Sequence, residues 1–292
     1  LILGGDHIYK MDYSVMLAEH QANCADLTVA CLEAPLQKAT EFGVMSIDDC
    51  GRVLAFDEKP TRPQPVPGST TSALASMGIY LFDANLLTDE LVRDAADTGS
   101  SHDFGKDIIP SLLSRHRVFA HPFANSCVNM VDGRPYWRDV GTVDAYWEAN
   151  MDLVSAAPEL NLYDDDWPIF SHQRQLAPVK FVLDDSGRGG VAINSLMASG
   201  CIVSGATVHG SVFSSKVRVA QGSVIEDSVI LPNVRIGQNV HLCRAVVDKH
   251  CVLPDGYCAG KDPNHDRARG LHVTPRGVTL IVPEMLGQAI HR

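Results

Sequence analysis

Two aspartates stand where a short apolar segment gives way to a helical pattern. Asp6 follows two glycines in LILGGDHIYKMDY, and Asp139 precedes Gly141 and Thr142 in YWRDVGTVDAYWEAN. Gly141 allows close backbone approach, and Thr142 has the side chain of a helix N-cap. A hard cation such as Mg²⁺ binds one or two carboxylates and leaves its other positions for phosphate oxygens. Asp6 and Asp139 therefore suit a metal pair, although Asp6 alone also suits a turn or an N-cap.

The stretch FDEKP offers a third group with possible chemistry, because Lys59 stands there between Glu58 and a proline. By composition alone, Lys59 suits a solvated surface position. In a phosphate site the same lysine would be a point charge on a phosphate, and Glu58 could hold a sugar hydroxyl. The residues by themselves leave both interpretations open.

The elements that would position these groups follow an alternating pattern over residues 1–154. Strand-like stretches such as LILGGD, DLTVACLEA and ASMGIYLFD alternate with helical ones such as DYSVMLAEHQANCA and ANLLTDELVRDAADTG. This order predicts an α/β domain with a mostly parallel, Rossmann-like sheet covered on both faces. Ligands of such sheets bind beyond the carboxyl ends of the strands, and we expect Asp6 at such an end.

Residues 155–190 differ, because Pro, Asp and Gly are frequent and no periodicity is visible. We interpret this stretch as a linker. Three apolar residues, Trp167, Ile169 and Phe170, are expected to hold it against neighbouring surfaces.

From residue 191 to residue 292 the spacing of β-branched residues changes to six. One series is Val234, Val240, Val246 and Val252, a second is Val224, Ile230, Ile236 and Leu242, and Ile202 and Val208 share the spacing. A period of six favours a β-helix, in which each hexad forms one side of a triangular coil. A β-sandwich with fortuitous spacing is the alternative. Residues 259–292 are expected to form a cap or a subunit contact.

Composition narrows the class of partners. The 292 residues carry a net charge of −11, which argues against general binding to nucleic acid or to anionic membranes. No apolar run approaches the twenty residues that a membrane helix needs. The eight cysteines are scattered without a CxxC pair, so we expect free thiols and a cytoplasmic protein.

Several motifs in fixed order carry a family resemblance. GDHIYKMDY, EFGVM, FDEKP, SMGIYLFD, DFGKDIIP and YWRDVGTVDAYWEAN resemble the glucose-1-phosphate adenylyltransferases of bacteria, also called ADP-glucose pyrophosphorylases. The segments NSLMASGCIVSGATVHGSV and GVTLIVPEML resemble the left-handed β-helix of hexapeptide repeats in that family. The resemblance implies transfer of the adenylyl group of ATP to α-D-glucose 1-phosphate with Mg²⁺, for glycogen or starch synthesis. It also implies small-molecule allosteric effectors and a homotetramer.

The resemblance further implies roles for single residues. The catalytic and metal-binding aspartates fall on Asp6 and Asp139, and the sugar-phosphate residues fall on Glu58 and Lys59. Further residues match positions that line the sugar pocket: Gly43, Ser76, Tyr80, Asp103 and Phe104. Lys10, Asp12 and Tyr13 match the motif without an assigned role.

The family begins with a nucleotide-binding segment that carries a glycine-rich loop of the type GGxGxRLxxLT, and no stretch of this sequence matches it. The chain thus resembles a family member without that segment. We expect this segment alone to be inactive as an adenylyltransferase.

Three alternatives compete with this interpretation. One is a sugar-1-phosphate nucleotidyltransferase that uses UTP, GTP or dTTP, because the absent segment would contain the residues that recognise the nucleotide base. A non-catalytic regulatory subunit is disfavoured because Asp6, Asp139 and Lys59 are all present. A hexapeptide-repeat acyltransferase would use a histidine at a coil edge, for which His209, His241 and His250 are candidates, and binding of coenzyme A would distinguish it.

Overall fold

The computed structural model of the chain describes residues 1–128, 130, 133–172 and 174–289. It divides into two compact units, Leu1–Trp137 and Arg138–Arg292. The catalytic segment predicted from the sequence ended at residue 154, so this division differs from it by one helix. Among the described helices, none combines the length and the apolar character needed to cross a bilayer.

The first unit is built on a five-stranded sheet in the order β4-β3-β5-β2-β6. The strands are β2 (Leu27–Pro35), β3 (Gly43–Ile47), β4 (Val53–Glu58), β5 (Ser72–Phe82) and β6 (Val118–Pro122). The pairs β2–β5, β3–β5 and β3–β4 are antiparallel, and β2–β6 is parallel. The described sheet is therefore mixed, and the expectation of mostly parallel strands does not hold for it.

Short connections explain the antiparallel pairs. β3 and β4 are joined by a turn in which Asp48 Oδ1 accepts hydrogen bonds from the backbone N–H groups of Cys50 and Arg52, both at 2.9 Å. Gly51 adopts a left-handed conformation there, with a φ of +79°. A parallel pair needs a crossover of about a dozen residues or more, and the connection between β3 and β4 is too short for one.

Some of the helical elements of this unit begin at capping side chains. They are α1 (Tyr13–Ala22), α2 (Leu36–Ala39), α3 (Ala84–Ala95), the π-helical turn η1 (Phe104–Ile108), α4 (Ile109–Leu112) and the 3-10 turn η2 (Phe123–Asn125). Asp12 caps α1 by accepting a hydrogen bond from the Ser14 N–H at 2.9 Å. Asp83 caps α3 in the same way through the N–H groups of Asn85 and Leu86. These carboxylates satisfy backbone donors that have no partner inside the helix.

The segment before the first glycines is extended but forms no buried strand. Ile2 and Tyr80 of β5 exchange two backbone hydrogen bonds of 2.8 and 3.0 Å. Leu1 and Leu3 are 54% and 45% exposed. One bridge to a neighbouring strand aligns the segment without covering the side chains on either side of Ile2.

The strand nearest to Asp6 follows this residue instead of preceding it. β1 (His7–Tyr9) begins directly after Asp6, and it forms a two-stranded sheet with β7 (Trp137–Asp139). The division between the two compact units falls inside β7. Asp6 therefore lies at the start of a short strand and not at the carboxyl end of a long one.

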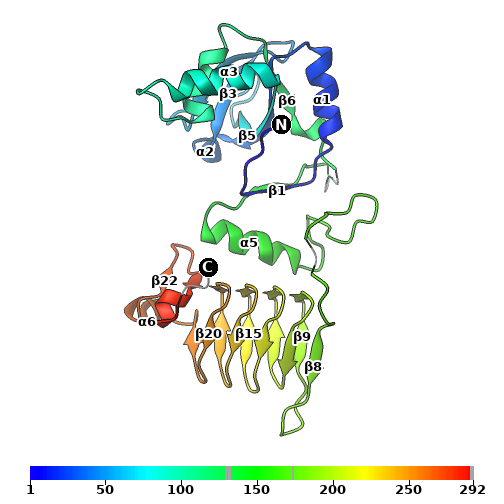
Figure 1. Cartoon of the computed structure of the whole chain (residues 1–292), viewed down its shortest axis with the longest axis vertical. Coiled ribbons are helices and arrows are strands. Elements are labelled where there is room, and N and C mark those ends of the chain that lie inside the picture. The colour runs from blue at the N-terminus through cyan, green and yellow to red at the C-terminus, as the bar shows by residue number, and fades with distance from the viewer. Residues whose placement is uncertain (129, 131–132, 173, 290–292) are drawn as a thin grey trace. The chain divides into compact units, whose positions relative to one another are not determined.

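The second unit contains a β-helix with three parallel faces (Figure 1). The first face is formed by β8 (Lys180–Val182), β11 (Ile202–Ser204), β14 (Arg218–Val219), β17 (Arg235–Ile236) and β20 (Val252–Leu253). The second is formed by β9 (Val191–Ile193), β12 (Thr207–His209), β15 (Val224–Glu226), β18 (His241–Cys243) and β21 (Cys258–Ala259). The third is formed by β10 (Leu196–Met197), β13 (Val212–Phe213), β16 (Val229–Ile230), β19 (Ala245–Val247), β23 (Thr279–Ile281) and β22 (His272–Val273), the last antiparallel to its neighbour.

The coils of this β-helix are shorter than three hexads. Val208 pairs with Ile225 and Ile225 with Leu242, which sets partners on successive coils 17 residues apart. The inward side chains of one coil follow each other at spacings of six, five and six residues: Val219, Ile225, Ile230 and Ile236. One side of the triangle therefore has five residues. For this reason a constant period of six wrongly predicts that the side chain of Val252 points inward. Leu253 points inward, and Val252 is 47% exposed.

The difference in burial between Leu242 and Val252 can be tested by substitution. We expect Leu242→Ala, at a fully buried position, to lower the free energy of unfolding by about 2–5 kcal/mol, because it removes buried methyl groups and leaves a cavity. Val252→Ala should change the same quantity by less than about 0.5 kcal/mol, because an exposed side chain loses little packing. Urea denaturation of both variants measures the two effects. Equal losses would show that Val252 also points inward.

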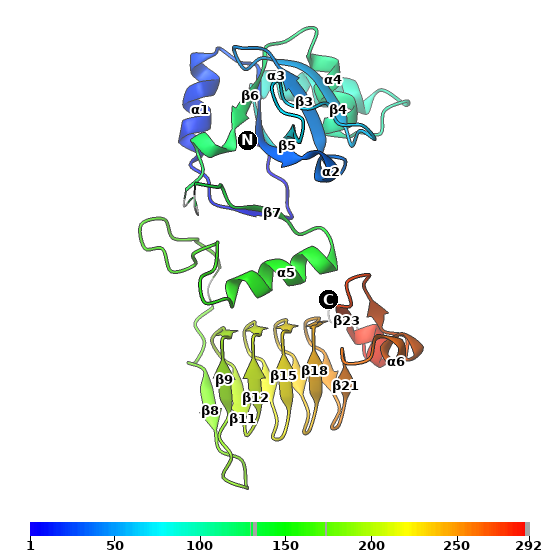
Figure 2. The same ribbon diagram turned by 180° about the vertical axis from the view of Figure 1, so that it is seen from behind.

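A helix covers the outside of the third face. α5 (Val143–Leu153) begins at Thr142, whose hydroxyl accepts a hydrogen bond from the Ala145 N–H at 3.2 Å, as predicted from the sequence. Four residues of α5 pack on the outward side chains of this face: Val143, Tyr146, Trp147 and Met151 against Val229, Val246 and Leu280. Figure 2 shows the helix running along the stacked coils. Because of this contact α5 belongs to the second unit.

The predicted linker is only partly a linker. β8 already pairs with β11, so the β-helix begins at residue 180 and not at residue 191. The side chains expected to hold the linker in place are exposed in the structure, with Trp167 at 39%, Ile169 at 50% and Phe170 at 91%. The expectation that these three residues pack on neighbouring surfaces is therefore wrong within the second unit.

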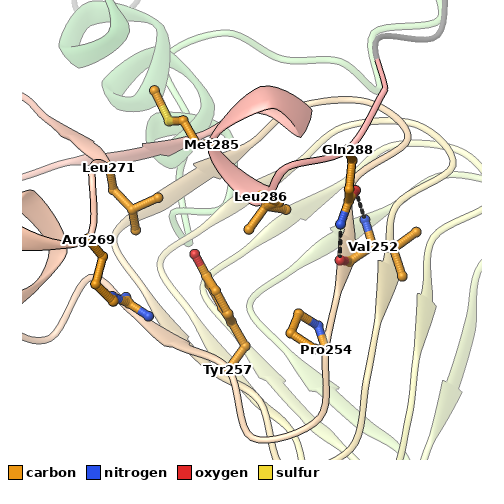
Figure 3. Close-up of a pocket in the computed structure, with 8 residues that line it drawn as sticks. All are labelled: Val252, Pro254, Tyr257, Arg269, Leu271, Met285, Leu286 and Gln288. Atoms are coloured by element: carbon orange, nitrogen blue, oxygen red, sulfur yellow. Dashed lines mark hydrogen bonds between the residues drawn. The ribbon is translucent and has the colours of Figure 1, made fainter.

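The end of the β-helix is covered by the C-terminal segment, which contains α6 (Pro263–Ala268) and the 3-10 turn η3 (Pro283–Leu286). Met285 and Leu286 pack against the β-helix core, which supports the cap expected there up to residue 289. A cavity of about 580 Å³ remains beside the last coil. Figure 3 shows the side chains that line it. Two of its polar side chains have partners, since Gln288 bonds both backbone groups of Val252 and Arg269 lies over the ring of Tyr257.

Candidate active site

Glu58 is held between two glycines. It ends β4 opposite Gly43, the first residue of β3. A Cβ atom at Gly43 would lie 2.8 Å from Glu58 Oε2, and a Cβ atom at Gly105 would lie closer still. Both positions therefore need glycine as long as the carboxylate stays in place. The structure brings the predicted residue Gly43 to Glu58 and adds Gly105, to which the sequence analysis gave no role.

The remaining residues of the predicted sugar pocket lie around the same carboxylate. Asp103 begins η1 by accepting hydrogen bonds from the N–H groups of Gly105 (2.8 Å) and Lys106 (2.9 Å). The ring of Phe104 lies 5.7 Å from that of Tyr80, and Ser76 interacts with the Tyr80 hydroxyl. We name these six residues the Glu58 cluster: Gly43, Glu58, Ser76, Tyr80, Asp103 and Phe104.

The cluster is partly desolvated and negatively charged. Burial raises the pKa of Glu58, and the nearby negative charge of Asp103 raises it further, while Lys59 opposes the shift. Burial also raises the pKa of the Tyr80 hydroxyl. Two carboxylates beside aromatic rings accept hydrogen bonds from several hydroxyl groups and offer a ring face for apolar atoms. This arrangement suits a polyhydroxylated ring such as a sugar.

Lys59 stands directly beside the cluster but is exposed. Its backbone adopts a φ of +47°, and its N–H donates to the carbonyl oxygen of Phe42 at 3.1 Å. A left-handed conformation is uncommon for a residue with a side chain, and such positions concentrate at functional sites. Its positive charge opposes the rise in the pKa of Glu58, so Lys59 acts electrostatically on the cluster.

The raised pKa of Glu58 predicts a pH-dependent cost for the fold. Between the ordinary pKa of 4.5 and the raised pKa of the folded chain, Glu58 is ionised in the unfolded chain and still protonated in the folded chain. This group therefore lowers the free energy of unfolding as the pH rises through that range. Glu58→Gln should therefore raise the melting temperature at pH 7, and the gain should vanish below about pH 4. Glu41→Gln, at an exposed carboxylate, is the control. A gain at pH 7 that persists in acid would contradict the assignment.

Asp6 and Asp139 are the two metal ligands predicted from the sequence. Asp6 and His7 lie in the first unit, and Asp139 is the second residue of the second unit. Asp139 Oδ1 also accepts a hydrogen bond from the Gly141 N–H at 2.8 Å, which fixes one oxygen and leaves the other for a ligand. Two carboxylates match the oxygen donors that Mg²⁺ prefers, and the imidazole of His7 matches them less well.

Two aromatic side chains in this region were missed from the sequence. The Trp137 ring lies 5.2 Å from His7 and 5.3 Å from Phe42, which directly precedes Gly43. Within the described residues, His7 Nδ1 and Trp137 Nε1 are buried without a hydrogen-bond partner. Burying such atoms is costly unless a ligand satisfies them. The signal was present in the motifs, because His7 follows Asp6 and Trp137 stands in YWRDVGT.

Comparison with protein families supports the two-part architecture. Residues 1–156 match the family described as nucleotidyl transferase, and residues 177–281 match the GlmU-like C-terminal hexapeptide family. The first match ends close to residue 154, where the catalytic segment was expected to end. The second begins just before β8, in agreement with the first coil of the β-helix.

Comparison with single proteins is more specific. The chain is 59% identical over 291 residues to the glucose-1-phosphate adenylyltransferase of Nitrosospira multiformis, covering 100% of this chain and 68% of that protein. It is 58% identical to that of Nitrosomonas europaea (100% and 67%) and 56% identical to that of Dechloromonas aromatica (99% and 65%). The chain thus spans about two thirds of the length of these relatives. Identity at this level over the whole chain shows that it belongs to the glucose-1-phosphate adenylyltransferase family.

Proposed function

We propose that the protein transfers the adenylyl group of ATP to α-D-glucose 1-phosphate, forming ADP-glucose and pyrophosphate. The observation that carries this proposal is the Glu58 cluster, in a chain 59% identical to a protein named for this reaction. Residues that the family resemblance assigns to the sugar pocket come from four separate elements, β3, β4, β5 and η1, and meet around one carboxylate.

In this mechanism the protein positions charged reactants and performs no covalent step of its own. Glu58 accepts hydrogen bonds from the sugar hydroxyls, and Phe104 and Tyr80 flank the ring. Lys59 neutralises the phosphate of glucose 1-phosphate, an oxygen of which attacks the α-phosphorus of ATP as pyrophosphate leaves. No general base is needed, because that phosphate is already ionised near pH 7.

The cation is assigned to Asp6 and Asp139. A bound Mg²⁺ would supply positive charge where the phosphate oxygens crowd together. The two aspartates fit such a cation, because each offers carboxylate oxygens, the donors that Mg²⁺ prefers. Their task in the chain is to hold the cation, and Gly141 keeps the Asp139 carboxylate in its orientation.

Other properties extend the proposal on the strength of the family resemblance. They are a role in glycogen synthesis, a cytoplasmic location, a homotetrameric assembly and control by small-molecule effectors. Each has its own measurement, such as the mass of the assembly in solution. None is needed for the chemistry assigned to Asp6, Asp139, Glu58 and Lys59.

Binding and turnover test the proposal separately. Saturation-transfer NMR on this chain should detect glucose 1-phosphate, with weaker signals from mannose 1-phosphate and galactose 1-phosphate, and Glu58→Gln should abolish the difference. In the complete protein, pyrophosphate release should require glucose 1-phosphate and should prefer ATP over UTP, GTP and dTTP. Selective binding of another sugar phosphate, or a preference for another nucleotide, would favour a different sugar-1-phosphate nucleotidyltransferase. Binding of coenzyme A would favour an acyltransferase.

A further inference from the structure

The residues that lead into Asp103 are held by a carboxylate outside the Glu58 cluster. Asp94 stands in the last turn of α3 and is only 8% exposed. Its Oδ1 accepts a hydrogen bond from the Ser100 hydroxyl at 2.6 Å, and its Oδ2 lies 2.8 Å from His102 Nδ1. The Ser100 hydroxyl oxygen in turn accepts the His102 N–H at 2.9 Å. One buried carboxylate therefore fixes two of the three residues directly before Asp103.

A second carboxylate holds the residue between them. Asp107 of η1 accepts hydrogen bonds from the Ser101 hydroxyl at 2.6 Å and from the Ser101 N–H at 3.2 Å. The same oxygen accepts the Asp103 N–H at 3.1 Å. Each residue from 100 to 103 thus bonds either Asp94 or Asp107, and we name residues 100–102 the approach loop.

The approach loop has a conformation that needs such support. His102 has a φ of +59°, in the left-handed region that is uncommon for a residue with a side chain. A conformation of this kind persists only where the surroundings hold it. The next residue, Asp103, caps η1, and single π-helical turns are rare and frequent at functional sites. The loop therefore carries strain directly beside the residues assigned to the sugar.

The helix itself gives no reason for a carboxylate at position 94. A negative charge in the last turn of a helix opposes the helix dipole, and burial adds a desolvation cost that hydrogen bonds must offset. Glu90, the other buried carboxylate of α3, is paired with Arg93 and Arg115. Asp94 instead bonds the approach loop, and the hydrogen bonds from Ser100 and His102 hold the pKa of its carboxyl below the usual range.

We propose that Asp94 is a positioning residue for the sugar site, which holds Asp103 and Phe104 at the Glu58 cluster through its contacts with Ser100 and His102. The inference rests on the proposed function, because that function assigns the cluster to the sugar. The Phe104 ring lies 5.7 Å from the ring of Tyr80, so a shift of the approach loop would move this ring as well as the Asp103 carboxylate. Apparent affinity falls by the fraction of molecules that keep the binding conformation.

Titration with glucose 1-phosphate, followed by NMR, tests the proposal on the chain itself. Asp94→Ala should raise the dissociation constant by about 10-fold, as expected for a loop that is competent about one tenth of the time. Asp94→Asn should recover most of the affinity, because its amide can accept from the Ser100 hydroxyl and donate to a deprotonated His102 Nδ1. Asp89→Ala, at an exposed carboxylate of the same helix, is the control and should leave the affinity unchanged.

Two further measurements separate positioning from a general loss of stability. In the complete protein, Asp94→Ala should raise KM for glucose 1-phosphate and leave kcat and KM for ATP nearly unchanged, whereas partial unfolding would lower kcat. Ser100→Ala breaks the same contact from the loop side without altering α3, and it should weaken binding in the same direction. Without ligand, the backbone N–H groups of Gly105 and Lys106, which bond Asp103, should exchange faster with solvent in Asp94→Ala.

The outcomes distinguish this inference from the proposed function. If the parent chain binds glucose 1-phosphate and Asp94→Ala binds it equally well, only the role of Asp94 is overturned. Equal losses in Asp94→Ala and Asp94→Asn, or in Asp94→Ala and the Asp89→Ala control, would overturn it too. If the parent chain binds no glucose 1-phosphate, the proposed function fails and this inference fails with it.

Discussion

Replacing either Asp6 or Asp139 with asparagine should lower kcat of the complete protein by about 10²–10⁴-fold and change KM for glucose 1-phosphate much less. Each variant removes a negative charge from the cation site, and the cation acts most strongly as charge moves onto pyrophosphate. Asparagine has the size of aspartate, and at position 139 its oxygen can still accept the hydrogen bond of the Gly141 N–H. A loss of activity would therefore reflect the missing charge and not a broken turn.

The metal site has a readout besides turnover. Mn²⁺ can replace Mg²⁺ at carboxylate sites, and its electron paramagnetic resonance signal falls when it binds. Both variants should reduce Mn²⁺ binding, whereas Asp57→Asn, at an exposed carboxylate of β4, should not. Turnover equal to that of the parent protein in Asp6→Asn or Asp139→Asn would remove that aspartate from the metal site.

The second large effect is expected at Lys59. If this lysine holds the phosphate of glucose 1-phosphate, it contacts the group equally before and during attack, because the phosphate keeps its charge. Loss of such uniform binding raises KM and leaves kcat nearly unchanged. A charge-assisted contact of about 2–3 kcal/mol corresponds to a rise of about 30- to 150-fold in KM for glucose 1-phosphate after Lys59→Ala.

Several variants make this measurement selective. Lys59→Arg should restore binding only in part, because a planar guanidinium group does not replace a compact ammonium group in a fitted site. Lys38→Ala, at an exposed lysine of α2, should change neither KM. Equal rises in KM for ATP and for glucose 1-phosphate would place Lys59 between the two substrates. If neither KM changes, Lys59 is a solvated surface residue without a role in binding.

Residues singled out by their motifs lie together in the sheet unit because the chain turns sharply at each of these motifs. Gly43, Asp103 and Phe104 meet Glu58 because a strand start, a helix cap and a strand end lie next to one another in the sheet unit. Thr142 was recognised as a helix cap for a local reason, since its hydroxyl bonds a backbone N–H three residues later. Such features depend on neighbours in sequence.

Features that depend on distant contacts could not be predicted in this way. The pattern of α5 shows an apolar face but not that Val229, Val246 and Leu280 would cover it. The sequence did not reveal that one side of each coil has five residues, because the two sides of six residues produce most of the apparent period of six. His7 and Trp137 were overlooked, since no pattern in the sequence shows that His7 Nδ1 and Trp137 Nε1 are buried without a partner.

The contact between α5 and the third face also limits how this domain can change its length in evolution. Eleven residues of helix span about 16 Å, which matches three or four strands at about 4.8 Å. Trp147 Nε1 donates to the Asp227 carbonyl oxygen at 2.7 Å, and the Thr274 hydroxyl donates to Asp144 at 2.5 Å, so the helix is tied at both places. Duplication of a coil before β13 would preserve both ties. Duplication of a coil between β16 and β23 would separate the partners of these two hydrogen bonds by one strand spacing. Additional coils are therefore restricted to the end of the β-helix that lies before β13.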